Sequence, residues 1–156
     1  MHTFQNKLNR VLELMLIVLM TVLVLDVLWQ VFSRYLLSSP SSFTDELAGF
    51  LLIWVGVLGA AYVAGRKEHL AIDILIQRSP PARQRKLLFL IHALIFLFAL
   101  SVMVVGGAYL VYTRFELQVK SAALQLPLGY VYIVMPISGM IIMYNEVHHI
   151  LNLKRA

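Results

Sequence analysis

The chain has 156 residues, of which 60% are hydrophobic and 13% are charged, a balance typical of integral membrane proteins. It contains no cysteine, which excludes disulfides, thiolate metal sites and cysteine catalysis. The net charge is +5, but the basic residues flank apolar runs. They therefore indicate membrane topology, and no nucleic-acid partner is expected.

Four apolar runs cover most of the sequence, at 11–32, 47–65, 87–112 and 128–150. As a helix rising about 1.5 Å per residue, each run is long enough to cross a hydrocarbon core of about 30 Å. The runs lack the alternation of a barrel strand. We therefore predict an all-α integral membrane protein, with four transmembrane helices in a single domain over residues 1–156. The connections are too short for a soluble domain, so we expect no enzyme.

Basic residues are distributed unequally between the two ends of these spans. Ten lie on the side that carries both termini, and three lie on the other side. Short loops rich in Lys and Arg stay in the cytoplasm, so both termini are predicted to be cytoplasmic. The ten are Lys7, Arg10, Arg66, Lys67, Arg78, Arg83, Arg85, Lys86, Lys154 and Arg155, and the three are Arg34, Arg114 and Lys120.

Three polar residues lie in the outer half of the first span. Asp26, Gln30 and Arg34 are each four residues apart, which places them along one side of a helix. A carboxylate inside a membrane costs free energy unless it finds a polar partner. One interpretation is the ion or proton site of a stand-alone small exporter that uses Asp26. The preferred one is contact with another helix, in this chain or in a partner protein.

Acidic residues open the second span. Asp45 and Glu46 lie in its expected first turn. Negative charge there suits the positive end of the helix dipole, and helix capping alone would explain both residues. Contact with a partner protein is the alternative.

Small residues form a stripe along the second span. Gly56, Ala60 and Ala64 recur every four residues, with Gly59 beside them. Such a stripe lets helix backbones approach closely in lipid. Trp54 lies well inside the span, deeper than an ordinary interfacial anchor.

The loop after the second span carries Arg66 and His69, followed by a short apolar segment at 70–76 that contains Asp73. This segment is too short to span, so we expect it to lie along the cytoplasmic membrane surface. In the fourth span, Pro136 removes one backbone hydrogen bond and should kink the helix.

The histidines allow one further alternative. His92 begins the third span, and His148 and His149 end the fourth, so all three lie near the cytoplasmic face. Four-helix membrane bundles can hold a b-type haem between two such residues, for instance His92 and His148. Histidines at helix ends more often contact water or lipid headgroups, and that is the preferred interpretation.

The order and spacing of several motifs resemble the small membrane subunit of tripartite ATP-independent periplasmic (TRAP) transporters. One departure is Phe43, where that family frequently has Trp. The motifs are Arg34-Tyr35, Thr44-Asp45-Glu46-Leu47, Trp54, Gly59-Ala60, Arg66, His69 and Asp73, then Ser121 to Pro127, Pro136 and Gly139.

The resemblance implies a bacterial inner-membrane transporter with three parts. A periplasmic binding protein delivers an organic acid, such as a carboxylate or sialic acid, to a large membrane subunit driven by a sodium gradient. The small subunit enlarges the fixed scaffold and needs no cofactor, since sodium coupling belongs to the large subunit. Its expected partners are these two proteins and membrane lipid. The candidate interface residues are Asp26, Gln30, Arg34, Asp45, Glu46, Trp54, Gly56, Gly59, Ala60 and Ala64, and the cytoplasmic loop motif is Arg66, His69 and Asp73.

Overall fold

The computed structural model describes residues 2–36, 42–66 and 80–155. Within these residues, four helical stretches are long and apolar enough to cross a membrane: Gln5–Tyr35, Ser42–Arg66, Arg83–Glu116 and Leu128–Leu151. The described residues form no β-strand beyond one isolated bridge between Lys120 and Pro127. The prediction of an all-α protein with four potential membrane helices is confirmed. His69, Asp73 and the segment 70–76 lie outside the described residues.

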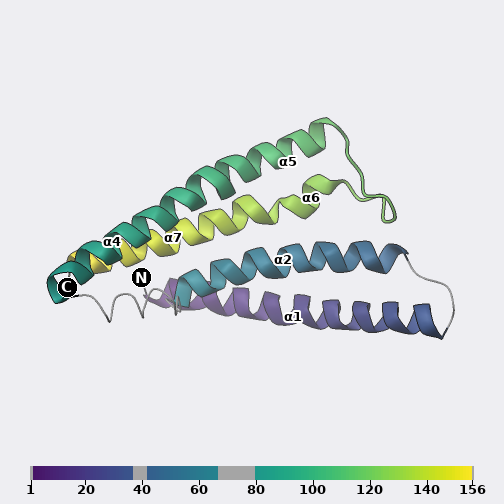
Figure 1. The fold of residues 1–156 in the computed structure, drawn as a ribbon, viewed down its shortest axis with the longest axis horizontal. Coiled ribbons are helices and arrows are strands. Elements are labelled where there is room, and N and C mark those ends of the chain that lie inside the picture. The colour runs from purple at the N-terminus through teal and green to yellow at the C-terminus, as the bar shows by residue number, and fades with distance from the viewer. Residues whose placement is uncertain (1, 37–41, 67–79, 156) are drawn as a thin grey trace.

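The first two helices form an antiparallel pair (Figure 1). Helix α1 runs from His2 to Tyr35 and α2 from Ser42 to Arg66. Leu12 of α1 and Leu58 of α2 are buried together with Val134 of the fourth span. Much of the remaining circumference of α1 is exposed apolar surface, as expected of a helix that faces lipid or another membrane protein.

The third span is one continuous helical path made of three pieces. These are α4 (Pro81–Phe98), a π-helical stretch η1 (Ala99–Gly106) and α5 (Gly107–Glu116). At the end of η1, the N–H of Gly107 bonds to the carbonyl of Val102, five residues back. Proline in the first turn starts α4, where its missing N–H costs no helical bond.

The fourth span is interrupted near its outer end. Helix α6 covers Leu128–Tyr132, and α7 follows from Val134 to Arg155. Pro136 has no N–H to donate to the carbonyl of Tyr132, four residues earlier, so regular α-helical bonding fails there. The helix is interrupted at Ile133, three residues before Pro136, and the predicted kink itself stays a prediction.

Glycines bring the third and fourth spans close together. A Cβ added to Gly139 of α7 would lie 2.8 Å from the Cβ of Met103 in η1. One added to Gly107 would lie 3.1 Å from both Met135 Cβ and Pro136 Cδ. Side chains at either glycine would therefore push the two spans apart.

The fourth span is the internal helix of the bundle. In its most apolar window 39% of residues are buried, against 11%, 17% and 6% for the other three spans in chain order. Ile142 of α7 packs in one cluster with Ala61 and Ala64 of α2 and Ala99 of η1. As Figure 1 shows, the start of α1 and the end of α7 lie at the same end of the bundle.

Candidate partner interface

The three polar residues in the outer half of α1 differ in their surroundings: Gln30 bonds to α2, Asp26 is buried and Arg34 is exposed. Asp26 is only 8% exposed, and its Oδ2 has no hydrogen-bond partner among the described residues. Gln30 donates a side-chain hydrogen bond to Oδ1 of Asp45 on α2. Arg34, the third, is exposed. A contact between this row and another protein stays a prediction, with Arg34 as the residue available at the surface.

Glu46 holds the outer loop that joins the third and fourth spans. Its carboxylate accepts hydrogen bonds from three consecutive backbone N–H groups: Ala122 and Ala123, each at 2.9 Å, and Leu124 at 2.7 Å. Charge-assisted bonds of this kind are stronger than neutral ones. Glu46 therefore ties α2 to the loop, a role that helix capping alone does not describe.

The loop is built to present those donors together. The N–H of Ser121 bonds to the carbonyl of Leu126, and the N–H of Leu126 bonds back to the Ser121 hydroxyl. Gln125 has a positive φ of 55°, which turns the chain sharply. The result is a tight turn whose successive N–H groups point toward one carboxylate, an arrangement that stabilises negative charge.

Replacing Glu46 with alanine should release this loop. The three N–H groups would lose their acceptor, so their hydrogen exchange should accelerate by about tenfold or more. Exchange mass spectrometry on a peptide covering 120–126 measures this directly. Asp45→Ala is the matched control, because it removes an adjacent carboxylate that binds Gln30 and should leave the loop protected. Unchanged exchange in the Glu46 variant would contradict the assigned role.

The small-residue stripe of α2 divides into an outward and an inward part. Gly56 and Ala60 are exposed, and a Cβ added to Gly56 or Gly59 would meet no heavy atom of the described residues within 4 Å. Ala64, in contrast, is buried in the core of this chain. A helix of another protein could therefore pack closely against Gly56 and Ala60. At Ala64 that position is occupied by the core of this chain.

Trp54 makes an internal contact. Its indole Nε1 donates a hydrogen bond to the carbonyl of Val131 in α6, over 3.0 Å. Val131 is the residue before Tyr132, whose carbonyl Pro136 leaves without its α-helical donor. Trp54 thus joins the first helix pair to the interrupted fourth span.

Arg66 of the loop motif lies at the end of α2 and reaches back toward α1. Its guanidinium is 3.8 Å from Glu13 Oε2 and 4.9 Å from the ring centre of Tyr62. The Arg66 and Glu13 side chains are 45% and 48% exposed, so the ion pair itself contributes little stability.

A buried polar layer lies where the start of α1 meets the end of α7. Glu146 and Asn145 are both fully buried at 0% exposure. His92 Nδ1 of α4 lies 2.5 Å from Glu146 Oε2, and the amide of Gln5 donates to Asn145 Oδ1 over 3.4 Å. This layer therefore links α4 and α1 to α7 by polar contacts.

The preferred interpretation of the histidines was wrong. His148 is 8% exposed and His149 3%, because the end of α7 is enclosed by the other helices. His149 Nε2 bonds to the carbonyl of Ala64 over 3.1 Å, and its ring lies 5.4 Å from that of His92. Sequence reasoning also missed Asn145 and Glu146. The available signal was a pair of strongly polar residues inside an expected span.

Among the described residues, no group of three or more His, Asp or Glu side chains is arranged to hold a metal ion. His92 and His149 are instead engaged with Glu146 and with the carbonyl of Ala64, contacts that join helices.

Comparison with known proteins identifies the family. The sequence profile described as "Tripartite ATP-independent periplasmic transporters, DctQ component" matches residues 23–156. A TRAP transporter small permease protein of Haemophilus influenzae is 25% identical over 144 residues, covering 91% of this chain and 86% of that protein. The sialic acid TRAP transporter small permease protein SiaQ of Vibrio cholerae is 22% identical over 147 residues, covering 94% and 83%.

A shorter match involves a permease. The sialic acid TRAP transporter permease protein SiaT of Haemophilus influenzae is 37% identical over 51 residues, which is 33% of this chain and 8% of SiaT. These matches favour a transporter subunit over a stand-alone exporter or a haem protein, and the family is not an enzyme. The chain belongs to the DctQ family, the small membrane subunits of TRAP transporters.

Proposed function

We propose that this chain binds the large membrane subunit of its transporter and enlarges the fixed scaffold during uptake. The transport is driven by sodium, the substrate is an organic acid of the carboxylate or sialic acid class, and a periplasmic binding protein delivers it. Sodium coupling belongs to the large subunit, so this chain has no cofactor of its own. The assembly lies in the bacterial inner membrane.

The observation that carries this proposal is the exposed glycine surface of α2. Glycine inside a helix costs about 0.5–1 kcal/mol relative to alanine, and a surface that faces only fluid lipid gains nothing from it. Gly49 and Gly56 are nevertheless exposed, and an added Cβ at either would meet open space. A second helix packed closely against α2 would explain both glycines and the neighbouring Ala60.

The relatives support the same assembly. A stretch similar to one third of this chain occurs within the polypeptide of a TRAP permease protein. Segments that share one polypeptide are held close together, which favours direct contact between the corresponding separate subunits. Two of the relatives are named as sialic acid transporter proteins, and sialic acid carries a carboxylate. Their names therefore support a carboxylate-bearing substrate for this transporter.

The proposed orientation places both termini in the cytoplasm. The ten-to-three distribution of basic residues supports it. The start of α1 and the end of α7 share one end of the bundle, as an even number of crossings requires (Figure 1). The loop held by Glu46 would then face the periplasm, the side on which a binding protein delivers substrate.

Bulky substitutions on the exposed α2 surface test the proposal. Gly56→Leu and Ala60→Leu should block close helix contact and lower recovery of the large subunit in co-purification by about tenfold, given an overpacking cost of about 1–3 kcal/mol. Arg34→Glu should weaken recovery if Arg34 meets an acidic partner. Substrate uptake by the assembled transporter should fall in parallel. Liposomes that contain this chain alone should show no uptake and give the background.

Ala108→Leu is the matched control, because Ala108 is an exposed small residue on α5, away from α1 and α2. It should behave like the parent. If the Gly56, Ala60 and Arg34 variants all co-purify and transport like the parent, then the large subunit does not bind this face.

A further inference from the structure

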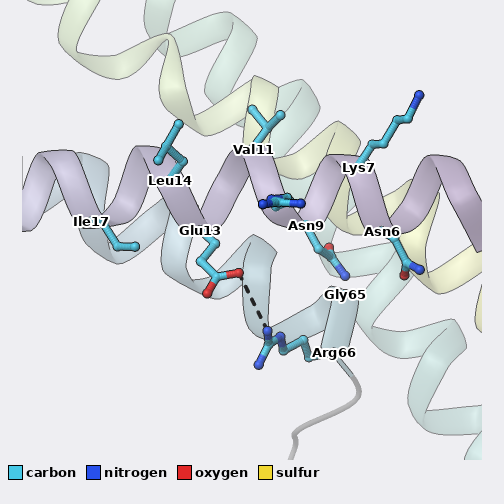
Figure 2. Close-up of a pocket in the computed structure, with 10 residues that line it drawn as sticks. Asn6, Lys7, Asn9, Val11, Glu13, Leu14, Ile17, Gly65 and Arg66 are labelled. Atoms are coloured by element: carbon cyan, nitrogen blue, oxygen red, sulfur yellow. Dashed lines mark ion pairs between the residues drawn. The ribbon is translucent and has the colours of Figure 1, made fainter.

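A shallow groove crosses the surface where α1 begins and α2 ends (Figure 2). Its volume is about 1100 Å³, and residues from both helices line it. The close approach of the two helices fixes its floor. A Cβ added to Gly65 of α2 would lie 2.5 Å from Asn9 Oδ1, so the Asn9 side chain of α1 packs directly onto the backbone of α2 there.

One end of the groove is positively charged. Lys7 and Arg10 project from exposed positions on the first turns of α1, and Arg66 extends from the end of α2. Glu13 also lines the groove and lies toward Arg66, as the dashed line in Figure 2 shows. Three cations against one carboxylate leave this end with a net positive charge.

The other end of the groove is apolar. Val11, Leu14 and Ile17 follow every three residues along α1 and are 55%, 64% and 57% exposed. They begin one turn beyond Lys7 and continue toward the middle of the span. From Lys7 to Ile17 the helix rises about 15 Å, which is half of a hydrocarbon core of about 30 Å. The groove therefore extends through one leaflet of the membrane.

We propose that this groove binds an anionic phospholipid. The phosphate lies at Lys7 and Arg10, and one acyl chain follows Val11, Leu14 and Ile17, while Arg66 on the other side of α1 stays paired with Glu13. Basic pockets between membrane helices recognise anionic headgroups in this way. A soluble anion would leave the three apolar side chains unused, and an uncharged acyl compound would leave the cations unmatched.

The test compares lipid retention by the purified full-length chain, using native mass spectrometry after exposure to phosphatidylglycerol and phosphatidylethanolamine in equal amounts. The parent should retain phosphatidylglycerol preferentially. Each basic residue near anionic lipid contributes a factor of about five, so Lys7→Gln combined with Arg10→Gln should lower that retention by about thirtyfold. Arg83→Gln combined with Lys86→Gln is the matched control. It removes the same charge from exposed positions at the start of α4, outside the groove, and should retain the lipid.

Two further measurements distinguish binding of the whole lipid from binding of its headgroup alone. Leu14→Asn should weaken retention while leaving every cation in place, and soluble glycerol phosphate should not displace the bound lipid. The proposal is overturned if both double variants lose lipid equally, since the attraction would then be general. Equal retention of the two lipids, or displacement by glycerol phosphate, would overturn it as well.

Discussion

Replacing Glu146 with alanine should strongly destabilise the contact between α4 and α7. The carboxylate is fully buried and lies 2.5 Å from His92 Nδ1, so the variant leaves a polar ring and a cavity inside the protein. Removing one member of a buried pair costs about 3–5 kcal/mol. Unfolding in mixed micelles of increasing dodecyl sulfate content, followed by circular dichroism, should show the transition at a clearly lower detergent fraction.

Two variants make this result specific. Glu146→Gln keeps the size of the side chain and one oxygen for His92, so its loss should be smaller. Glu13→Ala removes a glutamate whose contact with Arg66 is half exposed, and an exposed pair contributes about 0–1 kcal/mol. A Glu146→Ala protein as stable as Glu13→Ala would show that the buried pair does not hold α4 to α7.

Replacing Gly139 with leucine should give the second large effect. Even the first carbon of the new side chain would lie 2.8 Å from Met103 Cβ and 2.9 Å from Val104 Cγ2, distances at which atoms must shift. Overpacking of this kind costs about 1–3 kcal/mol. The same detergent titration measures the loss, and we expect the third span to separate from α7.

Gly56→Leu is the control for this experiment, because an added Cβ at Gly56 meets open space. The two variants should therefore differ in which property they lose, the stability of the isolated subunit or its binding to the large subunit. Gly139→Leu should weaken the isolated subunit, whereas Gly56→Leu should leave it stable and weaken only its recovery with the large subunit. Equal stability of the two isolated proteins would be incompatible with the close contact at Gly139.

The fold class follows from the sequence because membrane burial imposes long apolar runs, and those runs are visible without any tertiary information. The break in the fourth span is equally local, since Pro136 lacks an N–H whatever surrounds it. The outward position of Gly56 and Ala60 agrees with the expected contact stripe. Ala64 belongs to the same stripe but is buried in the core, because α7 packs against it. The sequence of α2 alone does not show where α7 packs.

The polar contacts could not be predicted, because each joins residues that are far apart in sequence. The backbone groups that bind Glu46 lie 76 to 78 residues after it in the sequence, and His92 is separated from Glu146 by 54 residues. Capping gave a sufficient local explanation for Glu46, so nothing suggested a distant loop. Burial of the histidines depends on how the helix ends converge, which residue type and position within a span do not determine.

The π-helical stretch η1 corrects the angular phase of the third span. Ala99, Met103 and Gly107 all contact α7 although each is four residues from the next. In a regular α-helix four residues turn through about 400°, so successive positions would drift by about 40° and leave the contact after two steps. Such spacing would otherwise require the two helices to wind about each other in a right-handed sense. The wider turns of η1 lower the rotation per residue, so the third span keeps contact with α7 from Ala99 to Gly107.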